Sequence, residues 1–209
     1  MGDGRAHGAA RGVLRAVAGA QAQQPLLLLV GGPPGSGKSV VADALGVRTG
    51  IVTLHKDGFK EPLMTDLGVR SAAESSALSA AAVQMLFVSA EAVLRRGLDV
   101  IIESTLNAGD VAPVRALQRE RQCAVIQLHV TATIDVLVDR WHARMGRRHP
   151  GHLDSERLPE MRARVEAGTW DAIALDAPLL VIDTSDADEF DVERWLDELR
   201  RAQAAAATR

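Results

Sequence analysis

A glycine-rich sequence of eight residues constrains this chain more than any other feature. It follows the apolar run 26–30 and precedes the helical pattern 39–45. Glycines let backbone N–H groups point into one concavity, and the helix that follows adds its positive N-terminal end. The sequence therefore predicts a phosphate-binding loop between a strand and a helix. At every fixed position it fits the pattern G-x-x-x-x-G-K-[ST]: Gly32-Pro33-Pro34-Gly35-Ser36-Gly37-Lys38-Ser39.

The residue types of the loop suggest their tasks. Lys38 is expected to reach the β- and γ-phosphates of a nucleotide, and the Ser39 hydroxyl is expected to hold Mg²⁺. We assign the eight loop residues and the next residue, Val40, to nucleotide binding. A glycine-rich turn without function is the alternative, and a complete match in this context makes it a poor explanation.

Apolar runs alternate with helical patterns through the body of the chain. Runs without clean apolar–polar alternation suit strands that are buried on both faces of a parallel sheet. Strands that alternate with helices predict an α/β three-layer sandwich. The expected strands are 26–30, 51–54, 100–102, 124–130 and 179–182; the expected helices are 39–45, 71–96, 111–121, 134–144 and 155–167.

The length of 209 residues suits one domain, which we place at 25–200. Residues 1–24 are rich in Ala, Gly, Arg and Gln and hold one acid, so we expect a flexible tail. An Arg-rich, acid-poor start is also typical of a transit peptide. Residues 201–209 form an Ala-rich tail that we expect to be a fraying helix end.

Composition argues against several classes of protein. A net charge of −3 disfavours general DNA binding, and 3% aromatic residues disfavour a single-strand stacking platform, so we expect no nucleic-acid partner. The single cysteine, Cys123, fits a reducing cytoplasm. No apolar run approaches the length of about 20 residues that is needed to span a bilayer, so we expect no membrane partner. We expect a monomer or a homodimer.

The absence of other signatures narrows the class of nucleotide enzyme. The chain has no Asn-Lys-x-Asp guanine-reading motif, no Ser-Gly-Gly-Gln-like transporter signature, and no Asp-Glu pair closing an apolar strand. A small kinase is what these exclusions leave, with the loop holding ATP and other residues holding an acceptor hydroxyl.

Four pieces in this order resemble the P-loop small-molecule kinases, a group that includes chloramphenicol phosphotransferase, zeta toxins, gluconate kinase and phage polynucleotide kinase. The resemblance covers about 26–184 and implies a five-stranded parallel sheet, order 2-3-1-4-5, with a mobile helical lid near 140–155. The pieces are the glycine-rich loop, Lys56-Asp57-x-x-Lys60, Ile101-Ile102-Glu103-Ser104-Thr105 and Asp139-Arg140-x-x-x-Arg144.

The resemblance implies that Asp57 accepts the proton of the substrate hydroxyl, although a turn after a strand is another use of Asp. Lys60 could contact a phosphate or an acidic substrate, or be solvated. Glu103 ends an apolar run, where a carboxylate faces the ligand crevice of a parallel sheet and could hold substrate or the Mg²⁺ shell through water. Capping or an ion pair is its structural alternative.

Arginines gather on the expected lid. Arg140 and Arg144 are spaced i, i+4 and so share a helix face, and the resemblance implies that they close over ATP and steady the transferring phosphoryl group. A solvated basic face is the alternative, and Arg147 and Arg148 are less specific. Residues 149–154 suit a Pro-Gly turn, with a lid loop or a weakly supported metal site as other interpretations.

The 71–96 helical pattern carries small Ala and Ser residues, which would leave room for a compact substrate or allow close helix packing. We therefore predict an ATP- and Mg²⁺-dependent kinase whose acceptor is a hydroxyl of a small molecule: an antibiotic, nucleoside, sugar or nucleotide-sugar. A nucleotide-binding regulatory protein, a polynucleotide 5′-hydroxyl kinase and a plain ATPase are the alternatives.

Overall fold

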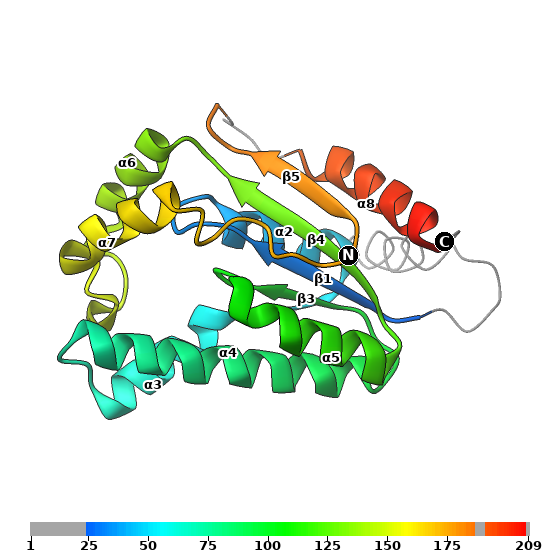
Figure 1. Cartoon of the computed structure of the whole chain (residues 1–209), viewed down its shortest axis with the longest axis horizontal. Coiled ribbons are helices and arrows are strands. Elements are labelled where there is room, and N and C mark those ends of the chain that lie inside the picture. Colours follow the sequence, from blue (N-terminus) through cyan, green and yellow to red (C-terminus); the bar gives the residue numbers. More distant parts are fainter. Residues whose placement is uncertain (1–23, 187–190, 208–209) are drawn as a thin grey trace, which may run out of the picture.

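Five parallel strands form the centre of the structure, a computed structural model that describes residues 24–186 and 191–207 (Figure 1). The strand order β2-β3-β1-β4-β5 confirms the predicted sheet. All five strands lie where the apolar runs predict them. They are β1 (Leu26–Gly31), β2 (Val52–His55), β3 (Val100–Glu103), β4 (Ala124–Thr131) and β5 (Leu179–Asp183).

Helices cover both faces of this sheet, so the chain forms the expected three layers (Figure 1). Leu27 and Leu29 of β1 pack toward α4 (Ala72–Leu94) and α5 (Val111–Arg121). The alternate residues of β1 pack toward α2 (Lys38–Thr49) and α8 (Val192–Ala207) on the other face. Every residue of β1 is buried, and truncating one of its leucines to alanine is expected to cost about 2–5 kcal/mol.

Helix α4 corrects the expectation that no segment resembles a membrane span. It has 23 residues, and an 18-residue window within it has a mean hydropathy of 1.7, so it is long and apolar enough to cross a bilayer by length and composition alone. In this structure its Leu86, Phe87 and Ala90 are buried against the sheet. The core helix of a globular protein passes the same test.

Two helices of the structure were not among those expected from the sequence. Helix α3 (Lys56–Leu67) begins directly after β2 and was not among the expected helices, because Gly58 and Pro62 are poor helix residues. Helix α8 begins at Val192, where no helix was expected, and extends through residues 201–207, where we expected a fraying helix end. The expected N-terminal tail lies, except for Gln24, outside the described residues.

The expected lid segment lies at the carboxyl end of the sheet (Figure 1). Trp141 Nε1 donates a hydrogen bond of 2.8 Å to the backbone carbonyl of Asp154, which ties α6 to the start of α7. Helices α5 and α6 coincide with the predicted 111–121 and 134–144. The segment contains α6 (Ile134–Arg144), the short turn η2 (Pro150–His152) and α7 (Asp154–Glu166), and another short turn, η1 (Ala108–Asp110), follows β3.

Candidate active site

A cavity of about 510 Å³ opens at the carboxyl end of the sheet. Pro34, Lys38 and Ser39 of the glycine-rich loop line it, together with residues from α3, α4, the end of β3 and the α6–α7 segment. Carboxyl ends of parallel strands are where ligands bind in open α/β sheets. The cavity therefore brings together elements that are far apart in the sequence.

The shape of the loop depends on its glycines. Gly32 has φ 137°, and a Cβ atom there would lie 1.9 Å from the Val130 carbonyl oxygen. Gly37 has φ 83° and caps the N-terminus of α2 without a side-chain hydrogen bond from any residue that the structure describes. The first N–H groups of α2 are therefore available to an anion, and the helix dipole favours one.

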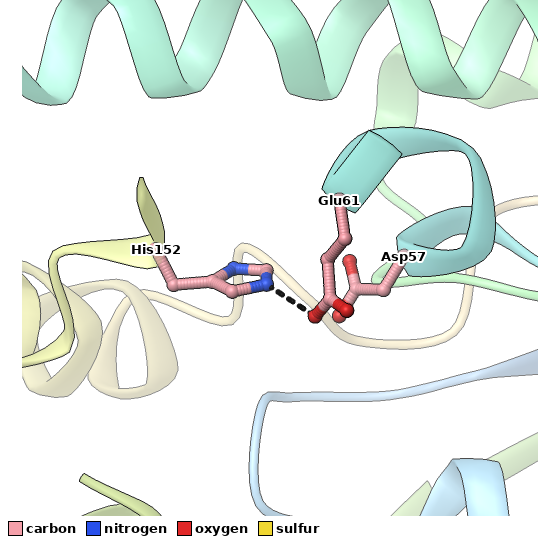
Figure 2. Close-up of side chains that lie close together, drawn as sticks. All are labelled: Asp57, Glu61 and His152. Atoms are coloured by element: carbon pink, nitrogen blue, oxygen red, sulfur yellow. Dashed lines mark hydrogen bonds and ion pairs between the residues drawn. The ribbon is translucent and has the colours of Figure 1, made fainter. Parts of the chain in front are cut away.

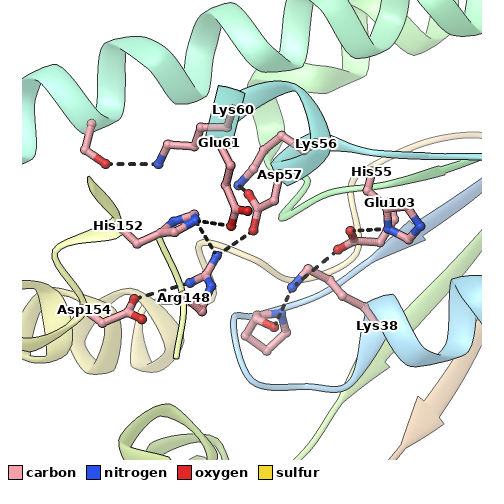
Figure 3. Close-up of polar contacts among 12 residues, drawn as sticks. Lys38, His55, Lys56, Asp57, Lys60, Glu61, Glu103, Arg148, His152 and Asp154 are labelled. Atoms are coloured by element: carbon pink, nitrogen blue, oxygen red, sulfur yellow. Dashed lines mark hydrogen bonds and ion pairs between the residues drawn. The ribbon is translucent and has the colours of Figure 1, made fainter. Parts of the chain in front are cut away.

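The Lys38 side chain connects the phosphate loop to the end of β3. Its Nζ lies 3.7 Å from Glu103 Oε1 and 3.5 Å from the Pro33 carbonyl oxygen (Figure 3). Burial lowers the pKa of Lys38, and Glu103 opposes that shift. Glu103 thus has the ion-pair role that we listed as its alternative, and it also lines the cavity.

His55 is a residue that the sequence analysis missed. Its Nδ1 lies 3.1 Å from Glu103 Oε2 (Figure 3). Its Nε2 lies 2.9 Å from Asp43 Oδ1. The hydrogen bond with Glu103 is the main cause that raises the pKa of His55. Burial alone would raise the pKa of Glu103, but His55 and Lys38 together lower it, so Glu103 is held as a carboxylate.

Asp57 lies in the first turn of α3 and lines the cavity. Its Oδ2 accepts a 2.6 Å hydrogen bond from Arg148 Nη2. Its Oδ1 accepts no hydrogen bond from a described residue, although Lys56 Nζ lies 3.2 Å away. Burial alone would raise the pKa of Asp57, but Lys56, Arg148, His152 and Lys38 lower it well below its ordinary value. Asp57 is therefore an ionised carboxylate whose Oδ1 forms an ion pair with Lys56 but accepts no hydrogen bond from a described residue.

The two arginines predicted for the lid are spaced i, i+4, but they contact different parts of the structure. Arg140 does not line the cavity; it binds Thr184 through Oγ1 at 2.8 Å and the carbonyl at 2.7 Å, and it reaches the Gly35 carbonyl at 3.4 Å. Thr184 Oγ1 in turn donates to the Ser36 carbonyl at 3.0 Å. Arg140 therefore braces the back of the phosphate loop in this structure.

Arg144 lines the cavity and lies over the Trp141 ring, 4.1 Å from its centroid. Its Nη2 is 3.8 Å from Asp154 Oδ1. Its Nε and Nη2 are buried without a hydrogen-bond partner among the described residues. Burial, with Arg148 nearby, lowers the pKa of Arg144 to about 10. Such a guanidinium has unused donors for an oxyanion in the cavity.

Arg148 joins three groups on the α3 side of the cavity. Besides Asp57, it contacts Asp154 Oδ1 at 3.3 Å and His152 Nε2 at 3.1 Å (Figure 3). His152 is buried, and its Nε2 also lies 2.9 Å from Glu61 Oε1. Burial and the neighbouring Arg148 lower the pKa of His152. Sequence analysis left Arg148 and His152 without a definite role, and the structure places both in the cavity wall.

Asp57, Glu61 and His152 have ligand atoms within 4.8 Å of one another, close enough to hold a metal ion (Figure 2). The Arg148 guanidinium, however, already contacts Asp57 and His152, so a cationic group holds this position. His149 and His152, the pair considered from the sequence, do not converge. His149 Nε2 lies 3.2 Å from Thr65 Oγ1, and its Nδ1 accepts from the Gly151 N–H, as a turn residue does.

Oxygen donors suitable for Mg²⁺ line the same cavity near the loop. Ser39 is exposed at the start of α2, and Asp57 and Glu103 are carboxylates on neighbouring elements. Mg²⁺ prefers oxygen ligands and keeps several waters, so this set fits the ion. The Val40 side chain is 66% exposed and outside the cavity wall, which leaves only its backbone for the expected contact.

Lys60 lies one helical turn beyond Asp57 and also lines the cavity. It is only 2% exposed, and its Nζ donates a 3.0 Å hydrogen bond to Ser75 Oγ of α4. Burial lowers the pKa of Lys60 to about 8. The interpretation of Lys60 as a solvated surface residue is therefore wrong.

Comparison with known proteins agrees with this fold. A family model described as an AAA domain matches residues 27–167. An uncharacterized protein of Mycobacterium tuberculosis H37Rv, Rv2004c, is 30% identical over 132 residues, a match that covers 57% of this chain and 26% of that protein. The chain thus spans about a quarter of the length of this curated relative.

Solved structures of kinases are also similar to this chain. One, from Chloroflexus aurantiacus J-10-fl and named provisionally as a kinase, is 31% identical with a TM-score of 0.77; the match covers 86% of this chain and 99% of that one. A sugar kinase from Janibacter sp. HTCC2649 is 21% identical with a TM-score of 0.56, over 88% of this chain and 97% of that one. The second likeness supports the fold alone.

Proposed function

This chain belongs to the AAA-domain family, and we propose that it is an ATP-dependent kinase that phosphorylates a hydroxyl of a small molecule. One observation carries the proposal. The phosphate loop, the ionised Asp57, whose Oδ1 accepts no hydrogen bond from a residue that the structure describes, and the incompletely bonded Arg144 line one cavity. Phosphoryl transfer needs a phosphate cradle, a group that orients the hydroxyl, and cations on the transferring group.

The nucleotide side of the site is formed by the loop and by α2. Backbone N–H groups at the start of α2 would hold the phosphates, and Lys38 would contact the β- and γ-phosphates. Ser39 would hold Mg²⁺ directly, with Asp57 or Glu103 contributing through water. The bound ion would neutralise charge on the phosphate oxygens. Arg140 would act indirectly, by supporting the loop from behind.

The acceptor side is formed by α3 and the α6–α7 segment. Asp57 Oδ1 would accept the hydrogen bond of the acceptor hydroxyl and take its proton late in the transfer. The hydroxyl oxygen forms a bond to the γ-phosphorus, and the bond from that phosphorus to the β–γ bridging oxygen breaks. ADP leaves with the electron pair. Arg144, with Arg148 beside it, would stabilise the charge on the equatorial oxygens.

The dimensions of the cavity favour a small acceptor. A volume of about 510 Å³ lies within the range of small-molecule sites, about 300–1,000 Å³. Ser76, Ser79 and Ala80 line the α4 wall, so the small residues of this helix give room to a ligand. An antibiotic, nucleoside, sugar or nucleotide-sugar remains our proposed range of acceptors.

The test is phosphorylation of a panel of hydroxyl compounds. The purified chain is incubated with ATP, Mg²⁺ and a mixture of sugars, nucleosides, hydroxy acids and aminoglycosides, and products are read by mass spectrometry for the gain of one phosphate. We expect a phosphorylated compound that is absent with Asp57→Asn. ATP binding without a product, together with Asp57→Asn that binds ATP equally, would favour a regulatory protein. Rapid ATP loss without an acceptor would favour an ATPase.

A further inference from the structure

Lys60 is the buried cation of the cavity whose hydrogen-bond partner is neutral. It is 98% buried, and its Nζ donates to the Ser75 hydroxyl at 3.0 Å (Figure 3). Within residues 24–186 and 191–207, no carboxylate lies within ion-pair distance of Lys60. Burial without a counter-ion is costly for an ammonium group, and one hydroxyl acceptor compensates only part of that cost.

Neighbouring cations of the cavity, in contrast, have carboxylate partners. Arg148 pairs with Asp57 and Asp154, Arg157 Nε lies 3.2 Å from Glu160, and Arg164 Nη2 lies 2.7 Å from the same carboxylate. Seven lysines and arginines but five acids line the cavity. Lys60 therefore carries the positive charge on the acceptor side of the cavity that has no acidic partner among the described residues.

The spacing between Lys60 and Asp57 limits the length of a ligand that contacts both residues. The two residues are spaced i, i+3 on α3, so their Cβ atoms are about 5–6 Å apart on one face of the helix. Both side chains line the same cavity. A ligand that reaches both must carry its hydroxyl within a few bonds of the group that Lys60 binds.

We propose that Lys60 binds an anionic group of the acceptor, so that the substrate is a compact hydroxy acid or hydroxylated phosphate ester. This inference rests on the proposed kinase function and narrows its acceptor. The negative group would meet the Lys60 ammonium beside Ser75, and the hydroxyl would lie at Asp57 Oδ1. The acceptor-side charge would then be balanced by the substrate rather than by the protein.

A structural role for Lys60 predicts different behaviour. In that case the hydrogen bond to Ser75 merely joins α3 to α4, and Ser75→Ala would disturb the protein as much as Lys60→Met. Anion binding instead requires the charge of Lys60 and tolerates loss of the hydroxyl. Lys60→Met keeps the length and apolar stem of the side chain, which makes it the matched variant.

The experiment uses matched acceptors that differ in charge. D-Glycerate and D-gluconate carry a carboxylate, glycerol 3-phosphate carries a phosphate, and glyceramide, D-gluconamide and glycerol are their neutral partners. Transfer from ATP is measured for wild type, Lys60→Met and Ser75→Ala, and binding to the ADP-loaded protein is measured by calorimetry.

We expect at least one anionic compound to be preferred over its neutral partner. For it, Lys60→Met should lower kcat/KM by about 10- to 100-fold, mainly through KM, the range for a charged hydrogen bond. Ser75→Ala should change it by less than about 5-fold. Preference for the carboxylates or for the phosphate ester decides which anion the site takes.

Two results would separate this inference from the kinase function. Transfer to neutral compounds alone, with Lys60→Met unaffected, would overturn the anion site and leave the kinase intact. Charge-dependent binding that Lys60→Met abolishes, without transfer to any compound, would support the anion site and contradict the kinase. If neither binding nor transfer depends on charge, the inference is wrong.

Discussion

Arg148 Nη2 lies 2.6 Å from Asp57 Oδ2, and this ion pair joins the segment between α6 and α7 to the first turn of α3. The same guanidinium reaches Asp154 Oδ1 at 3.3 Å. Arg148 thus fixes Oδ2 of the proposed base, while Oδ1 lies 3.2 Å from Lys56 Nζ and accepts no hydrogen bond from a described residue. Because Arg148 contributes to the low pKa of Asp57, the carboxylate is ionised throughout the neutral range.

Arg148→Met should therefore reduce catalysis more than folding. The substitution frees Asp57 Oδ2 and removes a cation from the acceptor side, so we expect kcat/KM to fall by about 10²- to 10³-fold. Arg147→Met is the matched control, because Arg147 is the exposed arginine next to it in the chain. Equal losses for the two variants, measured with the acceptor found in the panel, would refute a specific role for Arg148.

Substitutions of Arg140 and of Arg144 should have different effects. Arg140→Met breaks hydrogen bonds that brace the loop, so thermal stability and nucleotide affinity should fall, with a loss of about 1–3 kcal/mol in the free energy of unfolding. Arg144→Met removes a guanidinium with unused donors, so kcat should fall while nucleotide affinity changes little. Calorimetric unfolding and nucleotide titration distinguish them. The reverse pattern would contradict this division.

Sequence and structure agree best where interactions are local. The phosphate loop and the strands were predictable because a contiguous motif and contiguous apolar runs specify them. Asp57 and Arg148 are 91 residues apart, and only the fold brings them together. Helix α3 was missed because Gly58 and Pro62 oppose helix formation, while tertiary packing of the buried Met64 stabilises it.

His55 was missed although a signal existed. It ends the second apolar run as Glu103 ends the third, and in a parallel sheet with neighbouring strands these ends meet. The register pairs the two residues directly, His55 with Glu103. Their hydrogen bond could therefore have been expected once the strand order 2-3-1-4-5 was inferred.

The His55–Glu103 pair predicts how stability depends on pH. The folded pKa of His55 is raised, so its protonated form adds stability that is fully present below the unfolded value of about 6.5. That contribution is lost as the pH rises through the folded pKa. The difference in melting temperature between wild type and His55→Leu should thus shrink from pH 6 to pH 9. A constant difference would exclude the charged pair.

Lys60 predicts the opposite slope. Its folded pKa is about 8 and its ordinary value is 10.5, so between these values the unfolded chain binds more protons and stability rises with pH. Below pH 8 both states are protonated and the full burial cost applies. Lys60→Met should therefore be more stable than wild type at pH 7, and the advantage should fade toward pH 10.5. Thermal unfolding across this range measures it; an advantage that does not fade would show that charge burial is not its cause.

The central claim is that Asp57 takes the proton of an acceptor hydroxyl while the loop holds ATP. The direct measurement is acceptor phosphorylation by wild type and Asp57→Asn at equal, saturating nucleotide occupancy. We expect Asp57→Asn to bind ATP normally and to lower product formation by about 10²- to 10⁴-fold, the range for a general base. Product formation within a few fold of wild type would contradict the assignment of Asp57 and the mechanism built on it.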